Sequence, residues 1–185
     1  MLSGNLISLR PILEEDLPII FQLVNDYSQL GPHIPFRFRT LHDLKKQYAE
    51  DGMMGEKNGG FAVLDKSENL VGWFAYFPTA QYVKGYEIGG RILRAEDWGK
   101  GYATEVVRLL AAYLFNAKDI LRVQVCFNVT NPASRRIAEK SGFSFEGRLR
   151  HGYMINNEPV DMEIWSLLRV ECPLLDEVVA ALQEK

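Results

Sequence analysis

Two glycines stand one residue apart at the start of an otherwise favourable amphipathic helix. The stretch AEDWGKGYATEVVRLLAAY covers residues 95–113, and its glycines, Gly99 and Gly101, precede the apolar face that begins at Thr104. A helix N-terminus leaves N–H groups unpaired and carries about half a positive charge, so it attracts anions. Glycines ahead of it let the backbone curl and bring several N–H groups to one point. The spacing therefore indicates a phosphate-binding nest, with a plain strand-to-helix turn as the alternative.

Spacing excludes two familiar phosphate loops. A P-loop requires G-x-x-x-x-G-K-[ST], but Arg94 stands at the first glycine position and Gly101 follows the Gly-Lys pair. The dinucleotide-binding fingerprint requires a third glycine where Thr104 stands, and an acidic residue about 20 residues later. Neither nucleotide-binding interpretation holds.

A second strand-to-helix passage reads FNVTNPASRRIAEKSGF, residues 127–143. Asn131 is a strong N-cap, Pro132 suits the first helical position and Gly142 suits the position after the last turn. Good capping is the simpler interpretation, and it is worth about 1 kcal/mol for the Asn131 side chain. We expect the strands that precede the two helices to be neighbours, which would open both helix N-termini at the same end of the sheet.

Hydrophobic periodicity predicts the elements that position these passages. We expect strands at residues 6–10, 61–64, 70–77, 86–93, 121–128, 145–154 and 160–168, the last two forming a hairpin. We expect helices at 13–24, from Thr40 to about Gly52, from Thr104 onward, at 132–141 and at about 173–184. This order, β-α-α-β-β-β-α-β-α-β-β-α, predicts one mixed α/β domain over residues 1–185.

Composition narrows the class of protein. The 185 residues fit one domain with a sizeable core. A net charge of −3 and a pI of about 5.7 argue against general nucleic-acid or membrane-surface binding. Two cysteines, Cys126 and Cys172, do not suggest a disulfide framework and favour a reducing compartment. Without a signal-peptide pattern or a membrane-spanning run, we expect a soluble cytoplasmic protein, either a monomer or a homodimer.

Taken together, the motifs resemble those of the GNAT superfamily of acyl-CoA-dependent N-acyltransferases. Within it, the chain is most similar to the ribosomal-protein alanine/serine N-terminal acetyltransferases. The resemblance rests on LISLRPILEEDL, YEIGGRILRAEDWGKGYATEVV, NVTNPASRRIAEKSGFSFEG and DMEIWSLL. The superfamily's pyrophosphate loop, [QR]-x-x-G-x-[GA], reads EDWGKG here and departs at Glu96. The resemblance implies a mixed, mostly antiparallel sheet of about seven strands, with helices on both faces and two central strands splayed apart at Gly89 and Gly90.

The resemblance also implies acetyl-CoA as co-substrate and assigns its contacts. The amides of residues 99–104 would hold the pyrophosphate, and the backbone of residues 92–94 would pair with the pantetheine arm. Asn131 would hydrogen-bond to that arm, while Lys100, Arg135 and Arg136 are candidates for the remaining phosphate charges. The predicted cofactor-binding set is Ile92, Leu93, Arg94, Gly99, Lys100, Gly101, Tyr102, Ala103, Thr104, Asn131 and Arg136.

Acetyl transfer from a thioester to an amine requires a neutral amine, a stabilised oxyanion and a proton for the leaving thiolate. Many superfamily members supply that proton from a Tyr, which is Ala138 here. The ribosomal-protein branch implies Ser134 in this role, and a helix-capping Ser is the alternative. Glu87 on the central strand is the candidate base, and a solvent-facing carboxylate is the alternative. A further Glu of this branch corresponds approximately to Gly152 here.

Other chemistries lack their residues. The histidines His33, His42 and His151 show no metal-ligand spacing, so we expect no metal. There is no G-x-S-x-G and no Cys beside a His, which favours direct attack by the amine over a covalent acyl-enzyme.

The acceptor is the open question, and the loop at residues 27–39 and the hairpin tip at 154–159 would shape its site. A peptide α-amine is about a tenth neutral at pH 7, whereas a Lys side chain is only about 0.04% neutral. A site with little base therefore favours a protein or peptide N-terminus. The alternatives are a small-molecule amine, such as an antibiotic, polyamine or amino acid, and a non-catalytic acyl-CoA-binding module.

Overall fold

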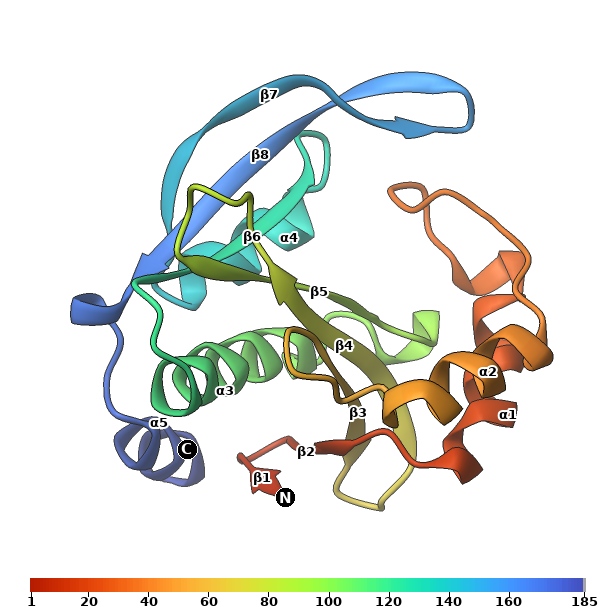
Figure 1. The fold of residues 1–185 in the computed structure, drawn as a ribbon, viewed down its shortest axis with the longest axis horizontal. Helices are drawn as coiled ribbons and strands as arrows, with labels where there is room; N and C mark the ends of the chain where they lie inside the picture. Colours follow the sequence, from red (N-terminus) through yellow and green to blue (C-terminus); the bar gives the residue numbers. More distant parts are fainter. Residues whose placement is uncertain (185) are drawn as a thin grey trace.

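One sheet organises the protein, and helices cover both of its faces (Figure 1). The computed structural model describes residues 1–184. The strands are β1 (Leu2–Ser3), β2 (Ile7–Pro11), β3 (Gly59–Asp65), β4 (Leu70–Pro78), β5 (Gly85–Ile92), β6 (Arg122–Asn128), β7 (Ser144–Ile155) and β8 (Glu158–Leu168). The α-helices are α1 (Leu17–Val24), α2 (Leu41–Asp51), α3 (Tyr102–Ala117), α4 (Pro132–Lys140) and α5 (Leu175–Gln183). Short 3-10 turns lie at Glu14–Asp16, Tyr27–Gln29, Ala95–Asp97 and Arg169–Glu171.

The strand order is β1-β2-β3-β4-β5-β6-β8-β7, and β5 and β6 form its one parallel pair within residues 1–184. Their register ends at Glu87 with Gln124, although β5 continues to Ile92 and β6 to Asn128. The two strands therefore part just before the mid-strand glycines of β5, as Figure 1 shows. This finding confirms the expected splay, and the helices on both faces confirm the expected fold class.

The elements follow the predicted order, with three differences. β1 is too short to give a periodic signal and exists because Leu2 pairs with Leu9 of β2. It brings the sheet to eight strands, against about seven expected. α3 begins at Tyr102, two residues earlier than expected. The β7–β8 turn holds only Asn156 and Asn157, whose φ angles of 51° and 64° are typical of a tight hairpin turn.

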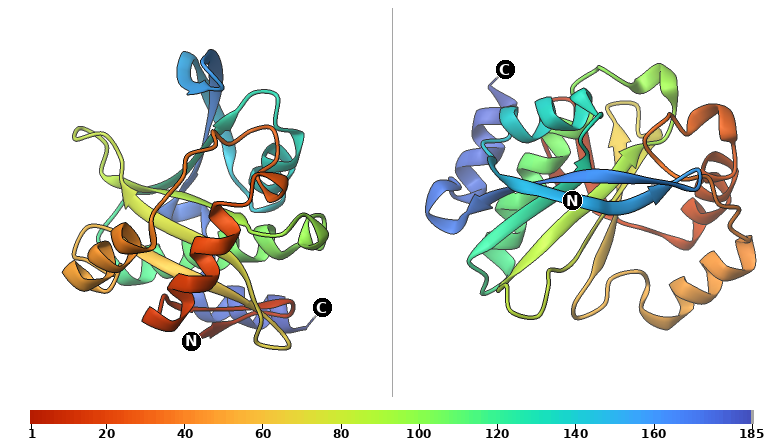
Figure 2. Two further views of the ribbon diagram at one scale, coloured as in Figure 1. Left: turned by 90° about the vertical axis from the view of Figure 1, so that its right-hand side faces the viewer. Right: turned by 90° about the horizontal axis from the view of Figure 1, so that it is seen from above.

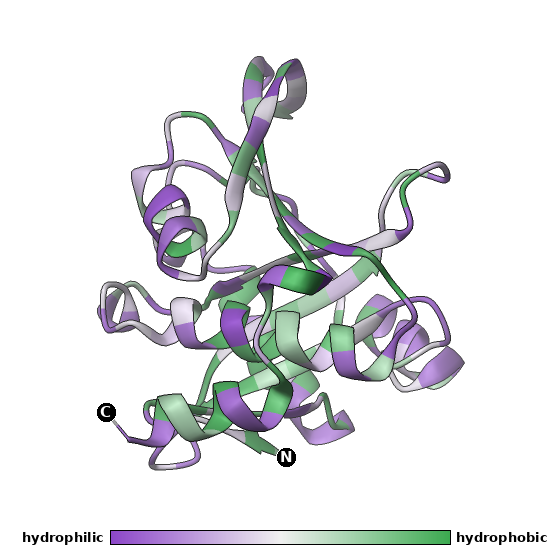
Figure 3. Ribbon diagram, turned by 90° about the vertical axis from the view of Figure 1, so that its left-hand side faces the viewer, coloured by the Kyte–Doolittle hydropathy of each residue, from purple (hydrophilic) through white to green (hydrophobic). Residues whose placement is uncertain are grey.

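Two hydrophobic cores lie on opposite faces of the sheet, because successive side chains of a strand point to opposite sides. On β3, Phe61 and Val63 belong to the core shared with α3, α4 and α5, whereas Ala62 and Leu64 belong to the core shared with α1 and α2. Figure 3 shows hydrophobic segments gathered in the centre of the molecule. The β7–β8 hairpin extends beyond these layers, as Figure 2 shows.

A buried carboxylate joins the start of α3 to the first long strand. Glu105 is 4% exposed, and its Oε1 accepts the backbone N–H groups of Leu6 and Ile7 at 2.9 and 3.0 Å. The contact spans about half of the chain and fixes the first turn of α3 against β2.

A second buried carboxylate fixes α4. Glu163 of β8 is 4% exposed and accepts hydrogen bonds from Arg135 of α4, at 2.5 and 3.2 Å, and from Trp165 Nε1 at 3.0 Å. Burial alone would raise the pKa of Glu163, but the hydrogen bonds from Arg135 and Trp165, with the charge of Arg135, lower it. Glu163 thereby anchors the N-terminal half of α4 to the sheet.

Replacing Glu163 with Gln should destabilise the fold by about 2 kcal/mol at pH 7, because hydrogen bonds to a charged group are lost. A lowered pKa stabilises the fold above the unfolded pKa of about 4.3, and that stability is lost as pH falls through the folded pKa. Urea unfolding measured from pH 7 to pH 3 should therefore show that the difference in unfolding free energy between wild type and Glu163→Gln becomes smaller in acid. Glu139→Gln, on the exposed side of α4, is the control and should change stability by less than about 0.5 kcal/mol. If that difference were the same at every pH, the hydrogen bonds would not depend on a charged Glu163, which would contradict this prediction.

Candidate active site

A cavity of about 460 Å³ opens where β5 and β6 part. Its walls come from the loop after α1, Phe74 of β4, the second half of β5, the turn before α3 and the first turn of that helix, the end of β6, and α4. Both helix N-termini singled out in the sequence therefore open into one space, as predicted from the order of the strands.

The glycine pair forms a nest at one end of the cavity. Gly99 and Gly101 have φ angles of 77° and 91°, which residues other than glycine rarely adopt. Gly101 is the N-cap of α3 and makes no side-chain cap, so the first N–H groups of the helix have no intrahelical partner. Trp98 closes the preceding turn by donating its Nε1–H to the carbonyl of Ile92 at 3.1 Å. Several N–H donors are thus gathered at the cavity wall, which is the donor set that a pyrophosphate requires.

The second helix N-terminus is preorganised by its own cap. Asn131 Oδ1 accepts the backbone N–H of Ser134 at 3.1 Å. Because the side-chain oxygen is held by the cap, the NH₂ group of Asn131 remains a donor at the cavity wall. The side chain of Ser134 and the buried methyl of Ala138 line the same wall.

The free edge of β5 can pair with an extended ligand. Leu93 donates its N–H to the carbonyl of Val71 in β4 at 2.8 Å. Backbone groups of successive residues in a strand point to alternate sides, so the N–H and C=O groups of Gly90 and Ile92 point away from β4, towards the gap between β5 and β6. A Cβ at Gly90 would lie 2.5 Å from the Cα of Phe74, so only glycine fits the backbone approach there. The arrangement suits the amide-bearing pantetheine arm of coenzyme A.

The structure brings most of the predicted cofactor residues to the cavity. The lining residues among them are Ile92, Gly99, Gly101, Tyr102, Ala103, Thr104, Asn131 and Arg136, together with the predicted acid Ser134.

Three predicted cofactor residues lie off the cavity wall. Leu93 is fully buried in the core beneath α1 and α2, and its N–H is used by β4. Arg94 donates from Nη1 to the carbonyl of Leu70 at 3.1 Å. Lys100 pairs with Asp97 at 2.6 Å, and this hydrogen bond raises the pKa of Lys100.

Arg135, a further phosphate candidate, is also engaged elsewhere. Its guanidinium is bound to Glu163, as described above. Arg136 is left as the exposed guanidinium of α4 at the cavity.

Glu87 lies beside the cavity rather than in its wall. Its carboxylate accepts a hydrogen bond from Gln124 Nε2 at 2.7 Å. Burial raises the pKa of Glu87, and the Gln124 hydrogen bond opposes part of that rise. The neighbouring Cys126 lines the cavity, and burial together with the charge of Glu87 raises its pKa to about 11. The thiol is therefore protonated at neutral pH and is a poor nucleophile, which agrees with direct attack by the amine.

The loop between α1 and α2 (residues 25–40) forms one wall, since its residues 30–34 line the cavity; from the sequence we expected residues 27–39 to shape the acceptor site but predicted no contacts for them. Gln29 Oε1 accepts the N–H of Ala95 at 2.8 Å, and the Trp98 ring packs against Gly31. These contacts join the loop to the turn before the nest. They have no local sequence signal, because each joins residues more than sixty positions apart.

Sequence reasoning also missed Arg91, which lines the cavity. The alternation of side chains along its strand could have singled it out, because Arg91 has the same parity as Glu87 and so shares its face of the sheet.

The chain belongs to the GNAT acetyltransferase family: the acetyltransferase (GNAT) domain matches residues 7–144. It is an N-acetyltransferase, with acetyl-CoA as the co-substrate of that family. The splayed strands, the nest and the second helix N-terminus fit that co-substrate, as described above.

The relatives are named for different acceptors. The chain is 33% identical over 136 residues to "Putative ribosomal N-acetyltransferase YdaF" of Bacillus subtilis, covering 74% of this chain and 70% of that protein. It is 28% identical to the spermidine N(1)-acetyltransferase of Escherichia coli K12, covering 85% and 83%. A solved structure of spermidine N-acetyltransferase from Vibrio cholerae, in complex with CoA and spermine, superposes with a TM-score of 0.75 at 23% identity, covering 89% and 96%. The last likeness concerns the fold alone.

Two kinds of feature are absent from residues 1–184. None of the helices combines the length and apolar character needed to cross a bilayer. Within the same residues, no three His, Cys, Asp or Glu side chains gather as a metal site would require.

Gly99→Ala should weaken coenzyme A binding, because the nest requires a left-handed backbone that costs about 1–2 kcal/mol for a residue with a Cβ. Gly52→Ala is a matched control: its φ is 64°, a Cβ meets nothing within 4 Å at either glycine, and it lies at the end of α2. Both variants should lose similar stability without ligand. Only Gly99→Ala should lose most of the rise in Tm that coenzyme A gives the wild type. An equal ligand-induced rise in both variants would disprove the nest. Gly101 is a less clean test, since a Cβ there would lie 3.1 Å from Leu6.

Proposed function

We propose that this enzyme transfers the acetyl group to the α-amine of a protein or peptide N-terminus. The observation that carries the proposal is how little base surrounds the cavity: Glu87 is the carboxylate beside the reacting end, and Asp97, the acidic residue of the described cavity wall, is paired with Lys100. A site with one carboxylate base works best on an amine that is partly neutral already, and a peptide α-amine is such an amine.

Each part of the site has a proposed task. Acetyl-CoA, when bound, supplies the acetyl group as a thioester. The amides of residues 99–104 hold the pyrophosphate, while the Asn131 amide and the free edge of β5 hold and orient the pantetheine arm. Glu87 takes the proton that the attacking amine loses, directly or through water. Ser134 gives a proton to the leaving sulfur as the C–N bond forms and the C–S bond breaks.

The names of the relatives suggest two classes of acceptor, a ribosomal protein and a polyamine. A polyamine carries several positive charges and needs carboxylates around it, but the cationic side chains of this cavity wall are Arg91, Arg136 and Lys140. Charge complementarity therefore supports the ribosomal-type alternative, a protein N-terminus, over spermidine. We propose the cytoplasm as the location, since Cys126 and Cys172 are both free thiols.

Ser134→Ala should lower kcat by about a hundredfold, as expected for the loss of a general acid, with little change in the affinity for acetyl-CoA. The variant should fold normally, because the cap of α4 uses the backbone N–H of Ser134 and not its hydroxyl. Steady-state release of coenzyme A, alongside Ser144→Ala as an exposed control, measures the effect. An unchanged kcat would leave Ser134 as a helix residue only.

The choice of amine can be read from one substrate. A peptide with a free α-amine and one internal Lys should be acetylated chiefly at the α-amine at pH 7, because roughly a tenth of that amine is neutral against about 0.04% of the Lys side chain. Mass spectrometry after limited reaction locates the acetyl group, and spermidine is run in parallel. Acetylation chiefly on Lys, or faster turnover of spermidine than of any peptide, would refute the proposed acceptor.

A further inference from the structure

Arg91 is a partly buried cation without a counter-charge. It lies on β5 and lines the cavity. Within residues 1–184 no carboxylate forms an ion pair with it, and its one hydrogen bond is a long one, 3.4 Å from Nη2 to the carbonyl of Leu23. Burial lowers the pKa of Arg91, since loss of solvent disfavours the charged form.

Two other partly buried arginines of the fold are paired with carboxylates. Arg10 pairs with Asp16, and Arg122 pairs with Glu146. Arg94, like Arg91, bonds only to a backbone carbonyl, but it lies outside the cavity wall. A desolvated, unpaired guanidinium that faces a cavity is a binding group for an anion, which its planar fork can hold with two hydrogen bonds.

Arg91 shares its face of the sheet with the candidate base. Side chains alternate along β5, so those of Glu87 and Arg91 point away from α3, whereas Ile88 and Ile92 belong to the core beneath α3. The Cα atoms of Glu87 and Arg91 are about 13 Å apart, from four residues at about 3.3 Å each. Gly89 lies between them, and the edge of the Phe77 ring from β4 lies 3.4 Å from where its Cβ would be.

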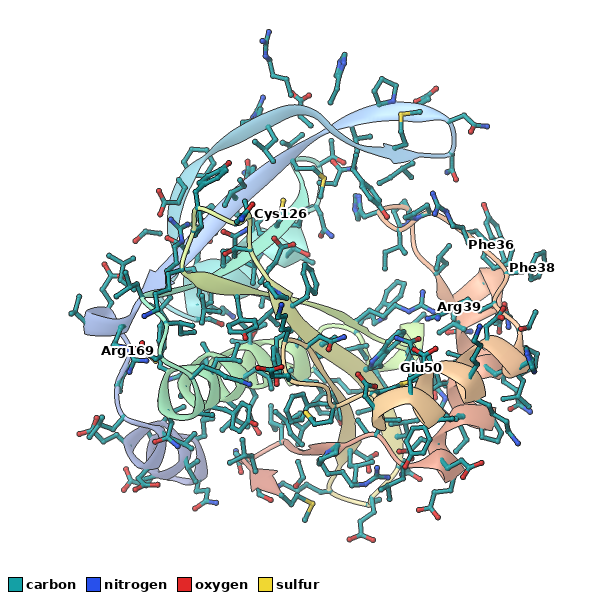
Figure 4. The ribbon with its side chains drawn as sticks, viewed as in Figure 1. Phe36, Phe38, Arg39, Glu50, Cys126 and Arg169 are labelled. Atoms are coloured by element: carbon teal, nitrogen blue, oxygen red, sulfur yellow. The ribbon has the colours of Figure 1, made fainter. Side chains whose placement is uncertain are left out.

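A second guanidinium approaches from the α1–α2 loop. The Arg39 guanidinium lies 6.0 Å from the centre of the Trp73 ring, and Trp73 is the cross-strand partner of Arg91. Arg39 donates to Gln47 and likewise has no carboxylate partner within residues 1–184. In Figure 4, Arg39 lies with Phe36 and Phe38 on this loop, while Cys126 lies on β6 across the sheet. The Phe36 and Phe38 rings meet edge to face with their centroids 4.7 Å apart, and this contact helps to hold the conformation of the loop.

Arg91 and the nest line one cavity, but the Arg91 side chain and the helix that follows the nest lie on opposite faces of β5. The nest at residues 99–104 opens at the start of α3, which covers the opposite face of β5. The side chain of Arg91 points to the face that α1, α2 and their loop cover, which is the side left for the acceptor.

We propose that the acceptor carries a carboxylate that Arg91 binds with help from Arg39. This carboxylate is an acidic side chain within the first few residues of the N-terminal peptide, and Glu87 takes the proton from the α-amine of the same peptide. This inference rests on the proposed function and narrows it. A free amino acid fits less well, because its amine and carboxylate are separated by a single carbon, much less than the spacing between Glu87 and Arg91.

The test uses peptides that start with Ser and carry Asp, Asn or Lys at position 2, 3 or 4, with free serine and spermidine as further substrates. For wild type, kcat/KM should be about tenfold or more higher for Asp than for Asn at one of these positions, and lower still for Lys. Arg91→Gln should bring the Asp-to-Asn ratio of kcat/KM close to one, chiefly by lowering kcat/KM for the Asp peptide. Arg91→Lys should keep only part of the wild-type Asp-to-Asn ratio, because an ammonium group keeps the charge but lacks the two parallel N–H donors of the guanidinium. Arg108→Gln, which removes the same charge from α3, should keep the wild-type ratio.

The outcomes separate this inference from the proposed function. Peptide turnover with equal rates for Asp and Asn at all three positions would overturn the carboxylate site and leave the N-terminal acceptor standing. A raised KM for acetyl-CoA in Arg91→Gln, equal for every peptide, would assign Arg91 to the co-substrate instead. Turnover of spermidine alone would refute both proposals.

Discussion

The parting of β5 and β6 is the constraint on which the rest of the site depends. Two parallel strands that stop pairing in the middle of a sheet leave backbone N–H and C=O groups without partners, and such groups are costly when water is excluded. The chain keeps them open to a cavity, so an extended ligand with its own amides can take the place of the missing ladder. The same separation brings the helices that follow the two strands, α3 and α4, to a common opening with their N-termini exposed.

The helices must be held in place for that opening to keep its shape, and buried carboxylates do this at each one. Glu105 ties the first turn of α3 to β2, and Glu163 ties α4 to β8 through Arg135. Neither carboxylate lines the cavity. Both lie where a charged hydrogen bond is shielded from water, which makes it stronger and its geometry more restricted than on the surface. A binding site built from backbone groups needs such supports, because the ligand-facing donors cannot be repositioned by rotating a side chain.

The two faces of β5 divide the work of the site. The face towards α3 carries the aliphatic core and leads to the glycine nest at residues 99–101, while the opposite face carries Glu87 and Arg91. Relatives include enzymes named for spermidine and enzymes named for ribosomal substrates. The fold therefore does not fix the acceptor, and the charges on the second face of β5 are the feature of this chain that bears on it.

The sequence by itself determined the order of the elements, the fold class and both helix N-termini, because each depends on local patterns: hydrophobic period, capping residues and glycine spacing. It also identified Ser134 and Asn131, which belong to the second of these local motifs. Only the tertiary structure decided which of the neighbouring residues face the cavity. Leu93 turns into the core and Lys100 pairs with Asp97, while Arg91 and residues 30–34 form walls that no motif marked. The physical reason is that burial and ion pairing depend on partners far away in the chain, and those partners become neighbours only when the sheet is assembled.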